Sequence, residues 1–182
     1  GVNPYLTANS YGNTTTTDLW DSLETATGVP VRAAMDTWIF QGGHPVISVE
    51  TCPEGIKVRQ SRFGYGEVGD ATWHVPIIVR AQVGSKTVES RLLLEDSEAT
   101  IDLGGTPAWA IVNAGGHGFY RVSYSKVLRD ALSGRALDVL SEAERYGLVD
   151  DTWSAVLAGD LKAEDHIALI TSLASETDLA VW

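Results

Sequence analysis

Cysteine is almost absent from this sequence, which contains only Cys52. A single cysteine excludes an internal disulfide and any zinc site built from two or more cysteines. It fits a reducing compartment, so we expect a cytoplasmic location. No apolar run approaches the ~20 residues of a membrane-spanning helix, and the start of the chain shows no signal-peptide pattern.

Basic residues are also scarce. Lysine and arginine together number 13, aspartate and glutamate 24, and the net charge is -11. An acidic chain lacks the basic footprint that nucleic-acid backbones and anionic membrane surfaces require, so we expect neither as a partner. Hydrophobic residues at 44% are typical of a globular chain that can bury a core.

Catalytic motifs are missing as well: the sequence has no H-E-x-x-H, no G-x-S-x-G, no G-x-G-x-x-G and no Walker lysine motif. The four histidines lie too far apart for a helical metal site, and we expect turn or surface positions for His44, His74, His117 and His166. The prediction is that this chain contains no catalytic, cofactor-binding or metal-ligating residue.

Three charged or glycine-rich clusters have simple explanations. Asp150-Asp151 and Glu142-Ala143-Glu144 are expected to be solvated charges near helix ends. Gly115-Gly116-His117-Gly118 precedes a strand and not a helix, so it lacks the helix dipole of a phosphate-binding loop. We expect a hairpin turn there.

The sequence does contain three successive patterns: a helical one, then a β pattern, then a second helical one. Residues 14–41 predict two helices, separated by Gly28 and Pro30. The second has an apolar stripe that is typical of packing, formed by Val31, Ala34, Met35 and Trp38. Residues 44–124 predict about seven short strands with Gly-rich turns, which favours an antiparallel β-sandwich. The clearest alternation covers residues 73–83, where Pro76 indicates an edge strand or a bulge.

After Ser125 the period becomes helical, and four short helices are expected, three of them ending at Gly134, Gly147 and Gly159. The third has an apolar stripe formed by Val149, Trp153, Val156 and Leu157. The expected fold is therefore mixed, mainly β plus α: short N-terminal helices, an approximately seven-stranded antiparallel β-sandwich, then an α-helical array. The apolar end, residues 179–182, is expected of an array that continues.

The stretch Gly118–Tyr124 lies where the β pattern gives way to the helical one, and we expect it to be the last strand. Arg121 is unusual there, because a guanidinium in a half-buried strand needs acceptors or solvent. Either its stem packs at a strand edge while its head reaches water, or it clamps two structural units together.

A series of motifs extends over nearly the whole chain: Tyr11-Gly12-Asn13-Thr14-Thr15, Asp18-Leu19-Trp20, Met35-Asp36-Thr37-Trp38, Gln41, Gly43, Pro45-Val46, Val49, Gln60, Arg62-Phe63, Trp73, Val75-Pro76, Asn113, Gly118-Phe119-Tyr120-Arg121-Val122, Tyr124, Ala143-Glu144-Arg145, Gly147-Leu148-Val149-Asp150-Asp151, Glu176-Thr177-Asp178 and Trp182. In this order the motifs resemble the aminopeptidase N family of zinc metallopeptidases. The sequence departs from the family pattern at His44 (usually aromatic), Ser123 (usually Asn) and Ser125 (usually Asp).

The resemblance implies three parts: residues 1–43 end the catalytic domain, residues 44–124 form the β-sandwich domain, and residues 125–182 begin the C-terminal helical domain. The family's zinc site and catalytic residues lie upstream of such a segment, so this chain would be a non-catalytic fragment and would itself hold no cofactor. Its partners would be the flanking domains, and peptides would be the parent's substrates. Trp38, Tyr120 and Arg121 are the candidates for contacts between domains.

A second hypothesis is a free-standing β-sandwich module that binds carbohydrate or protein. Trp73, Trp109 and Tyr65 could then supply a stacking platform for the ligand. The position of Trp73 on an alternating apolar face favours the core instead.

Overall fold

The computed structural model describes residues 2–182, which divide into two compact units, one ending at Gly42 and one covering Gly43–Trp182. The first unit contains α1 (Val2–Ala8), α2 (Thr16–Thr27) and α3 (Val31–Ile39). The two expected helices are present. Helix α1 was not predicted, because its seven residues are too few to show a helical apolar repeat.

Local chemistry explains where α2 begins and ends. The Thr15 backbone N–H donates to Asp18 Oδ2 over 2.7 Å, which forms part of a capping box. Gly28 ends the helix with φ of 68°, a left-handed conformation that glycine adopts at low cost. No described residue of these three helices is fully buried, so the apolar stripe that contains Trp38 is only partly covered within this unit.

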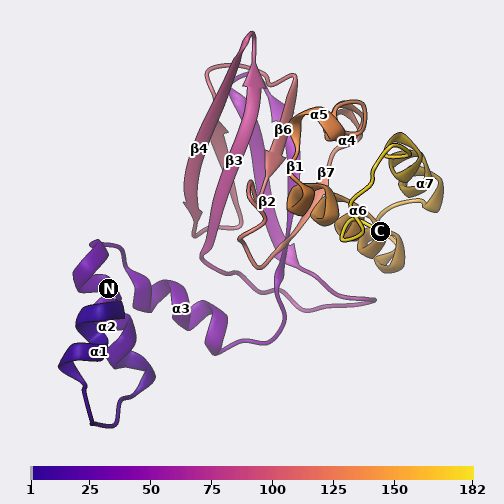
Figure 1. Ribbon diagram of the computed structural model, residues 1–182. Coiled ribbons are helices and arrows are strands. Elements are labelled where there is room, and N and C mark those ends of the chain that lie inside the picture. Colours follow the sequence, from indigo (N-terminus) through magenta and orange to yellow (C-terminus); the bar gives the residue numbers. More distant parts are fainter. Residues whose placement is uncertain (1) are drawn as a thin grey trace. The chain divides into compact units, whose positions relative to one another are not determined.

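Seven strands open the second unit, in two sheets that face each other (Figure 1). They are β1 (Pro45–Cys52), β2 (Gly55–Arg62), β3 (Val75–Val83), β4 (Lys86–Leu94), β5 (Glu98–Asp102), β6 (Trp109–Val112) and β7 (Arg121–Tyr124). The sheet orders are β5-β2-β1-β7 and β4-β3-β6. The predicted seven-stranded sandwich is confirmed, with one exception: β7 pairs with β1 in parallel.

The core lies between the sheets. Val75, Ile77, Val79 and Ala81 of β3 are at most 1% exposed, as the period-2 pattern predicted. Burying each large aliphatic side chain stabilises the fold by about 1.5–3 kcal/mol. Pro76 is exposed and lies outside the stretch Val79–Gln82 that pairs with β6, so β3 lacks a neighbour on that side at the proline.

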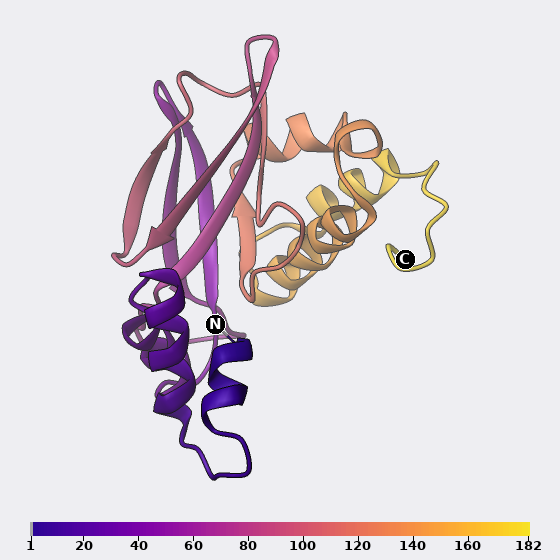
Figure 2. The same ribbon diagram turned by 60° about the vertical axis from the view of Figure 1, so that its left-hand side comes forward.

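Four helices follow the strands: α4 (Lys126–Ser133), α5 (Ala136–Val139), α6 (Glu142–Ala158) and α7 (Ala163–Ser172). Helices α4 and α6 contact the strands, and α7 packs on α4 and α6 (Figure 2). The predicted helix end at Gly147 is wrong, because α6 runs through that glycine to Gly159. A glycine inside a helix costs only about 1 kcal/mol, less than the tertiary contacts of a helix supply.

The orientation of α6 also differs from the expected one. Trp153 and Leu157 belong to the predicted apolar stripe, yet they are 47% and 54% exposed. The buried side of the helix contains Glu144, Leu148 and Thr152 instead, spaced four residues apart. Helix α6 therefore packs a partly polar side against the β unit and leaves apolar side chains on its surface.

Candidate functional site

Helix α6 meets β3, β7 and the loop of residues 113–120 through several buried or partly buried polar contacts. We call this region the junction. Its charged members are Arg80, Arg121, Glu144, Asp150 and Asp151. All except Arg80 belong to the motifs that carried the family resemblance.

Arg121 connects the last strand to the middle of α6. Its Nη1 donates to Asp150 Oδ2 over 2.7 Å and to Asp151 Oδ1 over 3.1 Å. The guanidinium carbon also lies 5.0 Å from the centre of the Phe63 ring, within the range of a cation–π contact. The Arg121 side chain is 22% exposed. The head group therefore binds two carboxylates of a helix in the same compact unit and does not simply reach into water.

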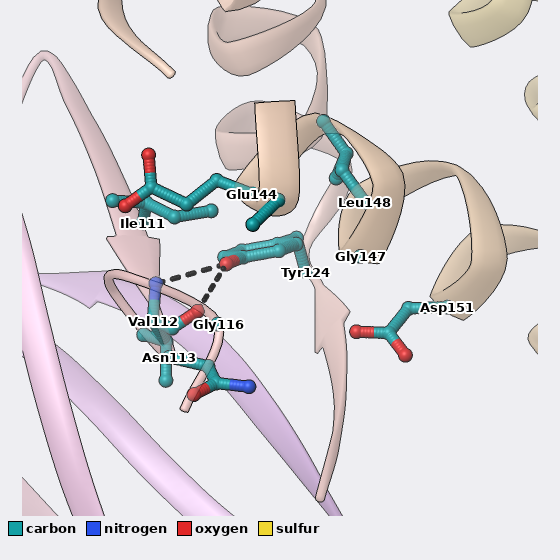
Figure 3. A pocket seen from close by; sticks show the side chains of 10 residues that line it. Ile111, Val112, Asn113, Gly116, Tyr124, Glu144, Gly147, Leu148 and Asp151 are labelled. Carbon is teal, nitrogen blue, oxygen red and sulfur yellow. Dashed lines mark hydrogen bonds between the residues drawn. The ribbon is translucent and has the colours of Figure 1, made fainter. Parts of the chain in front are cut away.

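Asp151 is not the solvated helix-end charge expected from the sequence. Its side chain is 15% exposed and projects from α6 toward β7, where Oδ2 accepts a hydrogen bond from the Val122 backbone N–H over 3.0 Å (Figure 3). Burial raises the pKa of Asp151 to about 7, against the opposing effects of the Val122 hydrogen bond and of Arg121. The aspartate thus occupies the hydrogen-bonding edge of β7.

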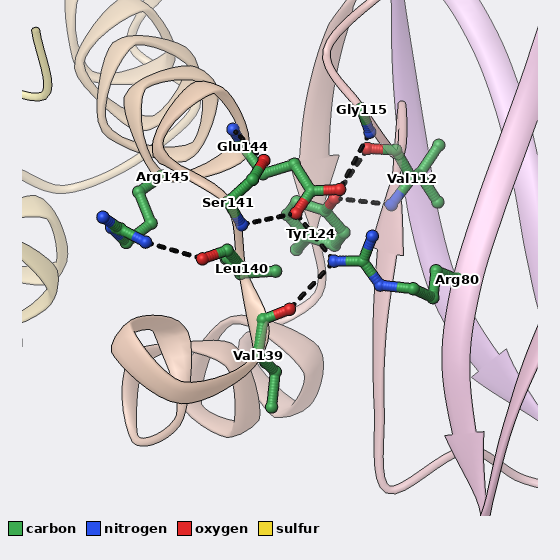
Figure 4. Close-up of polar contacts among 9 residues, drawn as sticks. All are labelled: Arg80, Val112, Gly115, Tyr124, Val139, Leu140, Ser141, Glu144 and Arg145. Carbon is green, nitrogen blue, oxygen red and sulfur yellow. Dashed lines mark hydrogen bonds and ion pairs between the residues drawn. The ribbon is translucent and has the colours of Figure 1, made fainter.

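Glu144 forms the second cross-link and is likewise buried, contrary to expectation. Its Oε2 lies 2.7 Å from Arg80 Nη2 of β3 and accepts from the Ser141 N–H, while Oε1 accepts from the Gly115 N–H, both over 2.8 Å (Figure 4). Arg80 also donates to the Val139 carbonyl. Burial acts to raise the pKa of Glu144, but the hydrogen bonds from Arg80, Ser141 and Gly115 outweigh it and lower the pKa.

Tyr124 ties the two sheets together beneath α6. Its hydroxyl accepts from the Val112 N–H over 2.9 Å and donates to the Val112 carbonyl over 3.2 Å (Figure 3). These bonds link β7 to β6 of the other sheet. A small cavity of about 30 Å³ lies beside the tyrosine, bounded on its other side by Glu144, Leu148 and Asp151 of α6.

Replacing Tyr124 by phenylalanine should lower the free energy of unfolding by about 1–3 kcal/mol, because the Val112 N–H then stays buried without an acceptor. Urea denaturation measures the effect. Tyr65→Phe is the control, since that ring is 63% exposed. Equal midpoints for the two variants would contradict the proposed role of the hydroxyl.

The glycine-rich segment before β7 is not the expected hairpin, because β6 and β7 belong to different sheets. The Asn113 side chain closes the loop instead: its Oδ1 accepts from the Gly118 N–H over 2.7 Å, and its Nδ2 donates to the Gly118 carbonyl over 3.1 Å. A Cβ at Gly118 would lie 2.1 Å from the Tyr120 ring. Only glycine fits this crossing between sheets.

Two of the predicted contact residues lie in the second unit and one in the first. Tyr120 is 7% exposed and lies next to Arg121, so its ring is part of the packed interior below the loop. Trp38 is half-buried in α3 of the first unit. The contacts between domains that were predicted for Trp38, Tyr120 and Arg121 stay predictions.

The stacking platform of the second hypothesis does not exist as predicted. Trp73 is 0% exposed and Trp109 is 3% exposed, so neither ring can stack on a ligand, and only Tyr65 lies at the surface. The expected surface position of His166 is also wrong, because it is 9% exposed and its Nδ1 lies 2.9 Å from the Thr152 hydroxyl. The alternating apolar face had favoured the core for Trp73, whereas no local pattern revealed the burial of Trp109 or His166.

Two departures from the family pattern have visible consequences. The His44 ring centre lies 5.3 Å from that of Phe63 and 5.5 Å from that of Phe119, so the imidazole packs where an aromatic ring is usual. Ser125 occupies the N-cap of α4, yet its buried hydroxyl has no hydrogen-bond partner within residues 2–182. The usual aspartate could cap this helix.

Neither a metal centre nor a membrane span was found in the part of the chain that the structure describes. Across residues 2–182, no three His, Cys, Asp or Glu side chains gather closely enough to hold a metal ion. No helix in this range combines the length and the apolarity needed to cross a bilayer.

Comparison with known proteins extends the sequence resemblance. Residues 109–182 match the family described as ERAP1-like C-terminal domain. The chain is 30% identical over 179 residues to Tricorn protease-interacting factor F2 of Thermoplasma acidophilum, covering 98% of the chain and 22% of that protein. It is 32% identical over 186 residues to Aminopeptidase M1-A of Oryza sativa, covering 97% and 21%. It is 31% identical over 195 residues to Puromycin-sensitive aminopeptidase of Caenorhabditis elegans, covering 100% and 20%.

The chain thus spans about a fifth of the length of these relatives, while nearly all of it takes part in each match. The β-sandwich and the helices that follow it agree with the architecture that the resemblance implied. Together, the family match at residues 109–182 and the similarity over almost the entire chain support the resemblance to a segment of the aminopeptidase N family.

Proposed function

We propose that this chain is the structural spacer of a zinc-dependent aminopeptidase, which removes N-terminal residues from peptides. In this proposal residues 1–43 end the catalytic domain, residues 44–124 form the β-sandwich domain and residues 125–182 begin the C-terminal helical domain. The upstream part of the protein would hold the zinc, and the lack of a group of metal ligands within residues 2–182 is in line with this proposal. The single cysteine fits a cytoplasmic location.

The observation that carries the proposal is the pair of charged cross-links at the junction. Arg121 joins β7 to Asp150 and Asp151, and Glu144 joins α6 to Arg80 of β3. Charge-assisted hydrogen bonds of this kind fix both distance and orientation. A spacer built this way would hold the helical domain at a constant position relative to the sandwich, as a cleft lined by separate domains requires.

Exposed apolar side chains on the helical array support a downstream domain as a partner. Trp153 and Leu157 lie four residues apart on α6, and Ile167 of α7 is 57% exposed. Exposed apolar clusters of this kind typically mark contact surfaces. Further helices of the C-terminal domain would cover them, and the upstream catalytic domain would supply the contacts proposed for Trp38.

The reading frame around this segment tests the proposal directly. We expect it to encode H-E-x-x-H and a more distant glutamate upstream of residue 1. We also expect the purified full-length protein to contain zinc and to release N-terminal residues from peptides until a chelator removes the metal. A frame without the motif, or a full-length protein that does not cleave peptides, would refute the proposed function.

Arg121→Ala in the full-length enzyme tests the spacer role. We expect a loss of about 1–3 kcal/mol in stability, because Asp150 and Asp151 lose their shared cation in a partly exposed site. The value of kcat/KM should fall while the zinc content stays unchanged. Arg59→Ala removes the same charge from a surface ion pair with Glu98, and it should leave both properties near wild type. Wild-type melting and wild-type kinetics for Arg121→Ala would refute the clamp.

A further inference from the structure

A groove of about 340 Å³ runs along the outer side of the junction, between α6 and the loop that leads into β7. Its volume is at the lower end of the ~300–1,000 Å³ that is typical of ligand sites. The space is therefore sufficient for one long side chain and the backbone beside it, but not for a folded domain.

Two aromatic rings line the groove and remain largely exposed. Phe119, on the loop, is 73% exposed, and Tyr146, on α6, is 52% exposed. They come from different elements, so a ligand in the groove would meet both. Their faces are electron-rich, which favours a cation or the aliphatic stem of a long side chain.

A carboxylate lies one helical turn beyond Tyr146, on the same side of α6. The Asp150 side chain is 41% exposed and uses Oδ2 to bind Arg121. Within residues 2–182, Oδ1 of Asp150 makes no hydrogen bond. Asp151, in contrast, uses Oδ1 for Arg121 and Oδ2 for the Val122 N–H. Two carboxylates therefore share one guanidinium, and Oδ1 of Asp150 can bind a second cation.

From these contacts we propose that the groove binds a lysine or arginine side chain of a peptide, with the cationic head at Asp150 and the stem between Phe119 and Tyr146. An anionic side chain would be repelled by Asp150, and an apolar one would bury the carboxylate without compensation. A second copy of this chain is a poor occupant, because its net charge of -11 opposes an acidic groove. The proposal concerns binding alone and does not depend on the parent's hydrolytic activity.

The test is an NMR titration of the ¹⁵N-labelled chain with the capped peptide Ac-Ala-Arg-Ala-NH₂. We expect amide shifts centred on residues 118–121 and 146–151. Replacing arginine by citrulline keeps the shape and removes the charge, and it should weaken binding at least fivefold. Equal binding of the two peptides, or shifts centred elsewhere, would overturn the proposal.

Variants distinguish binding in the groove from a general attraction between the acidic chain and the cationic peptide. Asp150→Asn should weaken binding of the arginine peptide at least fivefold, whereas Asp130→Asn should not change it. Asp130 is a matched control, since it is an exposed aspartate that pairs with Lys126 over 2.6 Å on α4. Phe119→Ala leaves the pair between Arg121 and Asp150 intact and should weaken binding about two- to fivefold, as expected when one of the two rings that contact the aliphatic stem is lost. An unchanged affinity in Phe119→Ala, or equal losses in the two aspartate variants, would contradict this site.

Discussion

Replacing Glu144 by alanine should lower the free energy of unfolding by about 3–5 kcal/mol, the cost of breaking one partner from a buried ion pair. The Glu144 side chain is 0% exposed, and its loss leaves Arg80 without its carboxylate. The backbone N–H groups of Gly115 and Ser141 lose their acceptor in the same step. Chemical denaturation followed by tryptophan fluorescence measures the change.

Two further variants identify the cause. Glu142→Ala removes an exposed carboxylate from the same helical turn and should cost about 1 kcal/mol or less. In the double variant Arg80→Leu with Glu144→Leu no orphaned charge remains, so a large part of the stability should return. If the double variant is as unstable as Glu144→Ala with Arg80 intact, the uncompensated charge is not the reason for the loss.

The second large effect is a pH dependence that originates at Asp151. Its folded-state pKa of about 7 lies above the ordinary value of 3.8 for an aspartate, so the folded protein binds this proton more tightly than the unfolded chain. The contribution to stability is therefore complete below pH 3.8 and is lost as the pH rises to about 7. Since each tenfold change in proton affinity is about 1.4 kcal/mol, the loss is on the order of 4 kcal/mol.

Asp151→Asn isolates this effect, because asparagine keeps an acceptor for the Val122 N–H and cannot ionise. The variant should match the wild type near pH 4 and become progressively more stable than it toward pH 8. Asp138→Asn, at an exposed position of α5, is the control: its free energy of unfolding should change with pH in the same way as that of the wild type. Parallel curves for Asp151→Asn as well would show that Asp151 does not titrate in this window.

Glu144 acts in the opposite direction and at lower pH. Its folded-state pKa is lowered, so its contribution is present above the unfolded value of 4.5 and is lost as the pH falls through the folded value. Glu144 therefore lowers the stability in acid, and Asp151 lowers it as the pH approaches 7. Their combined contribution is greatest in weak acid, between the windows in which Glu144 gains a proton and Asp151 loses one.

Local patterns in the sequence predicted most of the secondary structure. The alternation from Val75 to Ala81 identified a strand with one buried side, because side chains in a strand point to opposite faces in turn. Gly28 and Gly159 marked helix ends, since both adopt the left-handed conformation that glycine tolerates best. These properties depend on neighbouring residues alone.

The site was harder to predict, although one signal was present. Glu144, Leu148 and Thr152 follow one another at intervals of four, and Asp151 lies on the same side of the helix. We predicted the buried side from apolar residues alone and chose the one containing Trp153 and Leu157. Polar residues could be buried here because strands on the other side supply Arg80, Arg121 and backbone N–H groups as partners.

By itself, then, the sequence determined the order and type of most elements, the resemblance to a known family, and the absence of recognisable catalytic motifs. Only the tertiary structure decided that β7 pairs in parallel with β1, that α6 continues through Gly147, and that Asp151 and Glu144 are buried. The physical reason is the separation along the chain of the residues that interact. Helix caps and strand alternation arise between residues a few positions apart, whereas Arg80 and Glu144 are 64 positions apart and meet only when the sheets and helices have assembled.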